Sequence, residues 1–351
     1  MYIMKLSLLA VIVLALSAGA QDSKSVVAQT AAPVSSQILQ FQSSFGIAFK
    51  GSVAEGIKCD ARGNIYARLV SPSSSETYHG TGFLPVTRIK PDGTINGFFT
   101  VTADFPNFTV SDFFVMDDGT VFQAARSVSE GDNYVVSFSD RVPAGKAVRV
   151  NADPFVAHKI VVFKTGEFLL SGTRGDQNLT PYTAVFSPSG KLIKSIYEPE
   201  DEEAKQKAAR LRTDVALDHP QHGNSFVIRG DAALGSDGNA YLLRAGDPAS
   251  IYVISNKGQV LRKLTVPSPS PGLVARVLKA SSDRLAVGFL KRGMTQGAIV
   301  ITDYSGHLLT ILEADDPRML PGLMACYDGH EFRFVGFDGD NSPKINLAEL
   351  K

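Results

Sequence analysis

The stretch 54–69, AEGIKCDARGNIYARL, decides the fold of this chain. It reads as a short apolar strand, a tight turn that ends at Gly63, and a second strand over 64–68. The same order of strand, turn and strand returns further along the chain. The later copies cover 113–126, 160–174, 232–244, 277–292 and 324–337. Six copies of one hairpin therefore organise the sequence.

The spacing of the hairpins indicates the architecture. Successive turn residues are 56, 47, 72, 45 and 46 residues apart. The turn residues are Gly63, Gly119, Gly166, Gly238, Asp283 and Gly329. A second hairpin lies between most of the copies, usually with its own glycine-containing turn. These second hairpins cover 88–95, 135–148, 184–193, 251–261 and 299–309. Two hairpins make four strands, and a period of about 45–50 residues is typical of a propeller blade. The sequence therefore predicts an all-β fold, a six-bladed β-propeller with four-stranded blades.

The two ends of the chain are expected to close the ring. After the sixth copy only 344–350 (KINLAEL) is left for one further strand, and the missing strand is expected from 38–42 (ILQFQ). Such closure leaves no open sheet edge and places the first and last copies side by side. Cys59 and Cys326 are then expected on neighbouring inner strands. The sequence leaves two alternatives open for them, a disulfide or two buried free thiols.

Three segments stand apart from the repeats. Residues 1–20 have the pattern of an export signal peptide, in which Lys5 precedes an apolar core and small residues form a cleavage site at 18–20. Residues 21–35 are small and polar and are expected to form a flexible leader. A charged insertion with helical composition lies at about 198–228, and we expect a solvated helix there. The alternative is that this helix docks a partner.

The remaining residues, 36–351, are expected to form a single propeller domain. We expect a monomer in the periplasm or the extracellular space, without a membrane span after signal cleavage. The chain carries 35 basic and 35 acidic residues, so a nucleic-acid partner, which requires a basic excess, is not expected. The sequence contains no H-E-x-x-H, G-x-S-x-G or C-x-x-C motif and no P-loop, and no cofactor is expected.

One turn motif resembles a known superfamily. The pattern D-x-x-G-N-x-Y occurs after an apolar strand at 60–66 (DARGNIY), and a close variant occurs at 236–241 (SDGNAY). It resembles the six-bladed propeller superfamily that includes NHL-repeat, TolB-like and SMP-30/gluconolactonase-like proteins, over nearly all of 36–351. The resemblance implies the same fold. It does not specify an activity, because one fold hosts many functions.

The SMP-30/gluconolactonase branch implies a metal site. In that branch an E-G pair precedes the first inner strand and its Glu binds a divalent metal, and Glu55-Gly56 resembles this pair. Asp112 and Asp231 resemble the further ligands after a shift of one residue, whereas His158 departs from the pattern. The resemblance implies a Ca²⁺ or Zn²⁺ ion on Glu55, Asp112 and Asp231, since a hard cation takes oxygen ligands. The alternative is that these are loop carboxylates paired with nearby cations.

An arginine ends the second strand of the hairpin in five copies. These residues are Arg68, Arg126, Arg174, Arg244 and Arg292. We expect them to surround the mouth that also holds His158 and the three carboxylates, because the second strand returns to the face where the first begins. Guanidinium groups bind carboxylates, sulfates or phosphates in bidentate fashion. The alternative is that each arginine pairs with an adjoining carboxylate, such as Asp176 or Asp247, and ties the blades together.

These patterns favour a non-catalytic propeller that binds a ligand or a protein at the channel mouth. We expect the ligand to be anionic, for instance an acidic glycan or an acidic peptide segment. The alternative is an enzyme, a metal-dependent hydrolase (lactonase) of the SMP-30/gluconolactonase type. Oxygen ligands that converge on one point would favour the enzyme, and a wide mouth with unpaired arginines would favour the binding protein.

Overall fold

The computed structural model describes most of one compact unit, Val34–Lys351. The described residues are 36–49, 51–53, 56–70, 84–101, 107–174, 180–196, 231–246, 248–291, 297–314, 316–337 and 342–350. The expected export signal, leader and helical insertion lie outside these ranges. Within them, no helix has the length and apolar character needed to cross a membrane.

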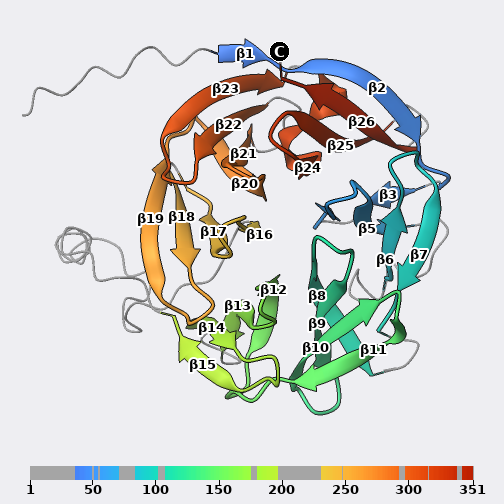
Figure 1. Cartoon of the computed structure of the whole chain (residues 1–351), viewed down its shortest axis with the longest axis vertical. Helices are drawn as coiled ribbons and strands as arrows, with labels where there is room; N and C mark the ends of the chain where they lie inside the picture. The colour runs from blue at the N-terminus through green and yellow to red at the C-terminus, as the bar shows by residue number, and fades with distance from the viewer. Residues whose placement is uncertain are drawn as a thin grey trace, which may run out of the picture. The chain divides into compact units, whose positions relative to one another are not determined.

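Six sheets, each built on four antiparallel strands, lie around a ring (Figure 1). The first strand of each sheet faces the centre, as β8, β12, β16, β20 and β24 show in the figure. The sheets are numbered here as blades 1 to 6 in chain order. The arrangement confirms the predicted all-β, six-bladed β-propeller.

The first half of the unit forms blades 1 to 3. Blade 1 contains β3 (Ser52–Val53), β4 (Lys58–Cys59), β5 (Ile65–Val70), β6 (Val86–Ile89) and β7 (Ile95–Phe99), with both β3 and β4 paired to β5. Blade 2 contains β8 (Phe108–Val115), β9 (Val121–Ser127), β10 (Asn133–Ser139) and β11 (Val142–Arg149). Blade 3 contains β12 (Val156–Val162), β13 (Phe168–Arg174), β14 (Thr180–Phe186) and β15 (Leu192–Ser195).

The second half forms blades 4 to 6. Blade 4 contains β16 (Ala232–Leu234), β17 (Ala240–Arg244), β18 (Ala249–Ile254) and β19 (Val260–Val266). Blade 5 contains β20 (Leu273–Ala280), β21 (Arg284–Lys291), β22 (Gly297–Asp303) and β23 (Leu308–Ala314). The short 3₁₀ helices η3 (Pro317–Met319) and η4 (Pro321–Leu323) lead to blade 6, which contains β24 (Met324–Tyr327), β25 (Glu331–Phe337) and β26 (Pro343–Glu349).

A strand from the N-terminal side completes blade 6. Strand β2 (Gln40–Gly46) pairs antiparallel with β26, from Gln40 opposite Glu349 to Gly46 opposite Lys344. The ring thus closes with an N-terminal strand as predicted, but this strand is β2, which shares only 40–42 with the predicted stretch 38–42. The predicted stretch is interrupted because Leu39 turns into the core, where it is 2% exposed. The residues before it form β1 (Ser36–Ile38), which pairs in parallel with β23 of blade 5.

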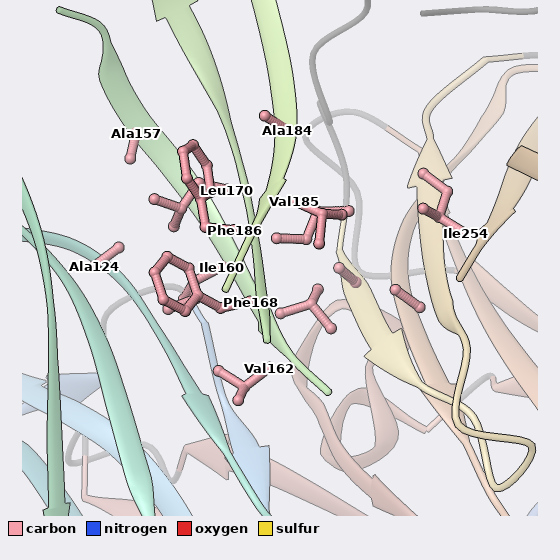
Figure 2. Packing of buried hydrophobic residues seen from close by; sticks show 14 of the residues in the cluster. Ala124, Ala157, Ile160, Val162, Phe168, Leu170, Ala184, Val185, Phe186 and Ile254 are labelled. Carbon is pink, nitrogen blue, oxygen red and sulfur yellow. The ribbon is translucent and has the colours of Figure 1, made fainter. Parts of the chain in front are cut away.

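The core lies between neighbouring blades. The middle strands of a blade are covered on both faces, so they are continuously apolar, as in Phe168, Leu169 and Leu170 of β13. Figure 2 shows side chains of blade 3 between Ala124 of blade 2 and Ile254 of blade 4. Burial of one such large apolar side chain stabilises the fold by about 1.5–3 kcal/mol.

The turn motif that predicted the fold has a direct chemical basis at Asp60. Its carboxylate accepts hydrogen bonds from the backbone N–H groups of Arg62 and Asn64, at 3.0 and 2.9 Å. The Asn64 amide and the Tyr66 hydroxyl also donate to it, at 2.8 and 3.0 Å. Gly63 has a φ of 75°, which favours glycine. Each residue type of D-x-x-G-N-x-Y therefore has a defined role in the turn.

Candidate functional site

The inner strands of five blades place charged side chains in the central channel. These residues, called the channel belt below, are Lys58, Asp112, Lys159, Asp231 and Lys279. Lys58 belongs to blade 1, and its Nζ lies 2.5 Å from Oδ1 of Asp231 at the start of blade 4. In a ring of six blades these two blades stand opposite each other, so this ion pair crosses the channel.

Asp231 holds a second ammonium group. The Nζ of Lys279, from blade 5, lies 3.1 Å from its Oδ2. The same Nζ donates a hydrogen bond to the carbonyl of Ile57 in blade 1, at 2.9 Å. Lys58 in turn donates to the carbonyl of Ala232, at 3.2 Å. The two lysines and one carboxylate thus join three blades through the channel.

Both carboxylates of the channel belt also accept a hydrogen bond from the backbone of the inner strand of the next blade. Asp112 Oδ2 accepts from the backbone N–H of Ile160 at 3.1 Å, and Asp231 Oδ2 accepts from that of Leu278 at 3.3 Å. The Nζ of Lys159 lies 4.0 Å from Oδ1 of Asp112. These contacts give the two aspartates a structural role in holding neighbouring blades together.

β-bulges interrupt two inner strands next to residues of the channel belt. The pairing of β8 with β9 shifts between Val110 and Asp112, and that of β12 with β13 shifts between Ala157 and Lys159. The extra residues are Ser111 and His158. Because side chains alternate along a strand, one extra residue redirects those that follow. The sequence alone does not locate these bulges.

The electrostatic balance of the channel belt keeps Asp231 ionised. Burial alone raises the pKa of Asp231, but the ammonium groups of Lys279 and Lys58 outweigh burial and hold this pKa well below its ordinary value. Burial lowers the pKa of Lys58, and the Asp231 carboxylate opposes that effect. The two partners therefore depend on each other for their charged states.

Arg68 adds a further cation next to the channel belt. Its side chain is only 4% exposed, and its guanidinium lies 5.6 Å from the centre of the Phe113 ring. Burial lowers the pKa of Arg68, and the Asp112 carboxylate opposes this. Its Nε and Nη2 have no hydrogen-bond partner within the described residues. Arg68 thus adds a fourth cation beside the three lysines and two carboxylates of the channel belt.

A cavity of about 480 Å³ lies at the end of the channel where the first hairpins turn. Residues on the inner strands of blades 1, 2, 4, 5 and 6 line it, together with the blade 3 turn residue Lys164. Lys58 and Lys279 lie towards its inner end. Lys58 is the lining residue furthest from the turn on its strand, and Lys279 is next to Leu278, the furthest one on β20. Their side chains are 11% and 10% exposed. Cys59 and Cys326 line its wall.

The rim of this cavity carries charges that are mostly paired. Lys164 lies 3.6 Å from Asp117, and Arg333 lies 2.8 Å from Glu331. Arg333 also donates to the carbonyl of Gly63, at 2.6 Å. The inner end differs from the rim, because two ammonium groups share one carboxylate there and positive charge is in excess.

The predicted metal ligands do not form a described metal site. Glu55 lies outside the described residues. Asp112 and Asp231 belong to the channel belt, where each already has an ammonium group and a backbone amide as partners. Across the described ranges, no group of three or more His, Cys, Asp or Glu side chains is arranged to hold a metal. The metal-dependent lactonase stays a prediction.

Two of the four described arginines of the predicted ring have hydrogen-bond partners within their own blades. Arg126 donates from Nε to the carbonyl of Gly131 at 3.1 Å, and Arg244 donates to the Tyr252 hydroxyl at 3.4 Å. Figure 1 places the strands that carry them, β9 and β17, in separate blades.

The remaining predicted residues of that mouth have local partners as well. Arg174 stacks on Tyr182 with its Cζ 3.6 Å from the ring centre, and its Nη2 lies 3.6 Å from Asp153. His158 is exposed, and its Nε2 lies 3.2 Å from the Thr173 hydroxyl. Arg292 lies outside the described residues. Neither His158 nor any of the four described arginines lines the 480 Å³ cavity, and their contacts fit the alternative role of stabilising the blades.

Sequence reasoning missed the three lysines of the channel belt. Lys58, Lys159 and Lys279 each stand beside an isoleucine or leucine on an inner strand that is otherwise largely apolar. A lysine in such a strand is rarely buried without a partner. The recurrence of such a lysine in three copies is the sequence signal that could have indicated the channel belt.

Comparisons with known proteins define the class by fold. A protein of unknown function from Dyadobacter fermentans superposes with a TM-score of 0.52 at 11% identity, over 89% of this chain and 99% of that chain. Regucalcin, a calcium-binding protein from Agrobacterium tumefaciens, gives 0.50 at 10% identity, over 89% and 96% of the two chains. Virginiamycin B lyase from Staphylococcus aureus gives 0.48 at 13% identity, over 89% and 100%.

No family model matches this sequence, and no curated protein matches it either. At these identities the likeness to solved structures shows the fold alone. The chain is therefore a six-bladed β-propeller with a charged, side-chain-filled channel and a cavity at one end of it.

Proposed function

We propose that this propeller is a non-catalytic binding protein that takes an anionic ligand into the cavity at the hairpin-turn end of the channel. The observation that carries the proposal is the inner end of that cavity, where Lys58 and Lys279 share the single carboxylate of Asp231. Two ammonium groups with one carboxylate leave an excess of positive charge next to the cavity. An anionic group on a ligand would balance it.

The size and burial of the cavity support a small ligand or the end of a larger one. Its volume of about 480 Å³ falls in the range of small-molecule sites. The two lysines are nearly buried, so a charge-assisted hydrogen bond to them is less screened than at the surface. A carboxylated sugar of an acidic glycan, or the acidic side chain of a peptide, fits this chemistry.

This proposal moves the binding site from the mouth that the sequence indicated to the other end of the channel. The arginines lie towards the ends of the second strands, whereas turns of the first hairpins surround the cavity. We further propose that residues 1–20 direct export to the periplasm or the extracellular space and that the protein acts as a monomer. The signal-like sequence supports the first of these statements.

The test is a thermal melt with glucuronate as the anionic probe and glucose as its neutral counterpart. A ligand at 100 times its Kd stabilises the folded state by about 2.7 kcal/mol, which raises the Tm by several degrees. We expect glucuronate to raise the Tm and glucose to leave it unchanged.

The matched variants are Lys279→Met and Lys257→Met. Lys257 is an exposed lysine that does not line the cavity. We expect the glucuronate shift to disappear in Lys279→Met and to persist in Lys257→Met. Equal shifts with both sugars, or an unchanged glucuronate shift in Lys279→Met, would overturn the proposal.

A further inference from the structure

Cys59 and Cys326 meet where the ring closes. Cys59 lies on β4 of blade 1 and Cys326 on β24 of blade 6, and these two inner strands are in contact. Both side chains belong to one apolar cluster with Ile57, Ala325 and Val335. Both also line the cavity, and both are free thiols in the structure. The first and last blades therefore present two thiols to each other within reach of solvent.

The two thiols have different surroundings. Cys59 is half-buried, whereas Cys326 is 7% exposed. The side-chain hydrogen bond from Cys326 lowers the pKa of Cys59, and the charges of Lys279 and Arg333 lower it further, against burial and the charge of Asp60. Burial raises the pKa of Cys326, and the hydrogen bond to Cys59 raises it again. One thiol is therefore accessible and inclined to ionise, and the other is sheltered and protonated.

We propose that Cys59 and Cys326 form a redox-active dithiol, in which Cys59 is the attacking thiol and Cys326 the resolving thiol, and whose disulfide joins the first and last blades. The contact of β4 with β24, the apolar cluster that both side chains share and the open cavity beside them carry this assignment. It is independent of the proposed anionic ligand.

The reaction is an exchange with an oxidised small-molecule disulfide, such as oxidised glutathione. The Cys59 thiolate attacks one sulfur of that disulfide, the S–S bond breaks, and one small thiolate leaves. A mixed disulfide on Cys59 remains. Cys326 then gives its proton to the departed thiolate and attacks Sγ of Cys59, which releases the second small thiolate. That thiolate takes up the proton that Cys59 lost on ionisation. The protein loses two electrons, and the external disulfide becomes two thiols.

A disulfide between Cys59 and Cys326 would stabilise the closed ring because of where these residues lie in the chain. In the reduced protein, blade 6 is completed by non-covalent pairing of β2 with β26. A bond between Cys59 and Cys326 adds a covalent link at the same junction and encloses most of the ring in one loop. Cross-links across long loops restrict the unfolded chain most. Oxidation therefore favours the closed ring over the opened chain.

The test follows the thiols of the purified protein in glutathione redox buffers. After equilibration with oxidised glutathione, we expect the intact mass to fall by two hydrogens, no thiol to react with iodoacetamide under denaturing conditions, and the Tm to rise by about 5 °C or more. In the reduced native protein, iodoacetamide should label Cys59 at least about tenfold faster than Cys326. Two thiols that persist in oxidised glutathione, or an oxidised protein without a raised Tm, would overturn the proposal.

Two serine variants separate the roles. With Cys326→Ser, the resolving step is absent, so a glutathione adduct on Cys59 should accumulate. With Cys59→Ser, the buried Cys326 should form no adduct on the same time scale. The reduced Tm of each variant checks that it is folded. An adduct that forms equally fast on both variants would refute the assignment of Cys59 as the attacking thiol.

Discussion

Asp231 is the residue on which the channel belt depends most. It is the only carboxylate among the described residues that contacts both Lys58 and Lys279. Replacement by Ala leaves two nearly buried ammonium groups without their counter-charge, and breaking a buried pair in this way costs about 3–5 kcal/mol. We expect Asp231→Ala to lower the free energy of unfolding by that amount, measured by urea denaturation at pH 7.

A surface ion pair provides the comparison for that variant. Asp140 lies 3.0 Å from Arg88 and its side chain is 70% exposed, so Asp140→Ala should cost less than about 1 kcal/mol. If both substitutions cost the same, Asp231 does not stabilise the fold through its buried ion pairs.

The depressed pKa of Asp231 also predicts how stability depends on pH. Its pKa in the folded state lies far below the value of about 3.9 expected in the unfolded chain. Its contribution is therefore complete above about pH 5 and is lost progressively as the pH falls below the unfolded value. Between pH 4 and pH 3, we expect Asp231→Asn to lose up to about 1.4 kcal/mol less than the wild type. Urea midpoints at pH 3, 4 and 5 measure the difference, and identical acid slopes would contradict it.

At the scale of a single element, β2 is a short strand whose removal is expected to affect the stability of the whole ring. It covers the outer edge of β26, and Leu39 just before it is buried against blades 5 and 6. We expect a chain that lacks residues 1–46 to melt at a lower temperature and to aggregate, because the edge of β26 and an apolar patch are exposed. A chain that lacks only residues 1–35 is the control and should keep the wild-type Tm. Equal Tm values for the two truncations would show that β2 does not close the ring.

The hairpins were predictable element by element, and the bulges were not. A hairpin depends on local chemistry, such as Asp60 bonding the backbone of its own turn and Gly63 adopting a positive φ. A bulge such as that at Ser111 depends on which side chains fit between neighbouring blades. For this reason the positions of Asp112 and Lys159 in the channel required the structure.

At the scale of the whole molecule, the number of blades followed from the repeat but the candidate site did not. The cavity takes its residues from all six blades, and Lys58 meets Asp231 only because the ring places blade 1 opposite blade 4. A contact between opposite blades leaves no repeating pattern in the sequence by which it could be predicted. The contact of Cys59 with Cys326 was accessible to sequence reasoning, because it follows from the closure of the ring alone.

The same whole-ring arrangement bears on the choice between the proposed binding protein and the metal-dependent hydrolase. A divalent cation in the channel would have to displace the ammonium groups from Asp112 and Asp231, and the other cations of the channel belt would repel it. We therefore expect Ca²⁺, Zn²⁺ and EDTA to leave the Tm of the protein unchanged. If a metal did raise the Tm, Glu55→Gln would decide its place. Loss of the shift in that variant would locate the ion at the predicted Glu55 site and favour the hydrolase, whereas a retained shift would locate it elsewhere on the protein.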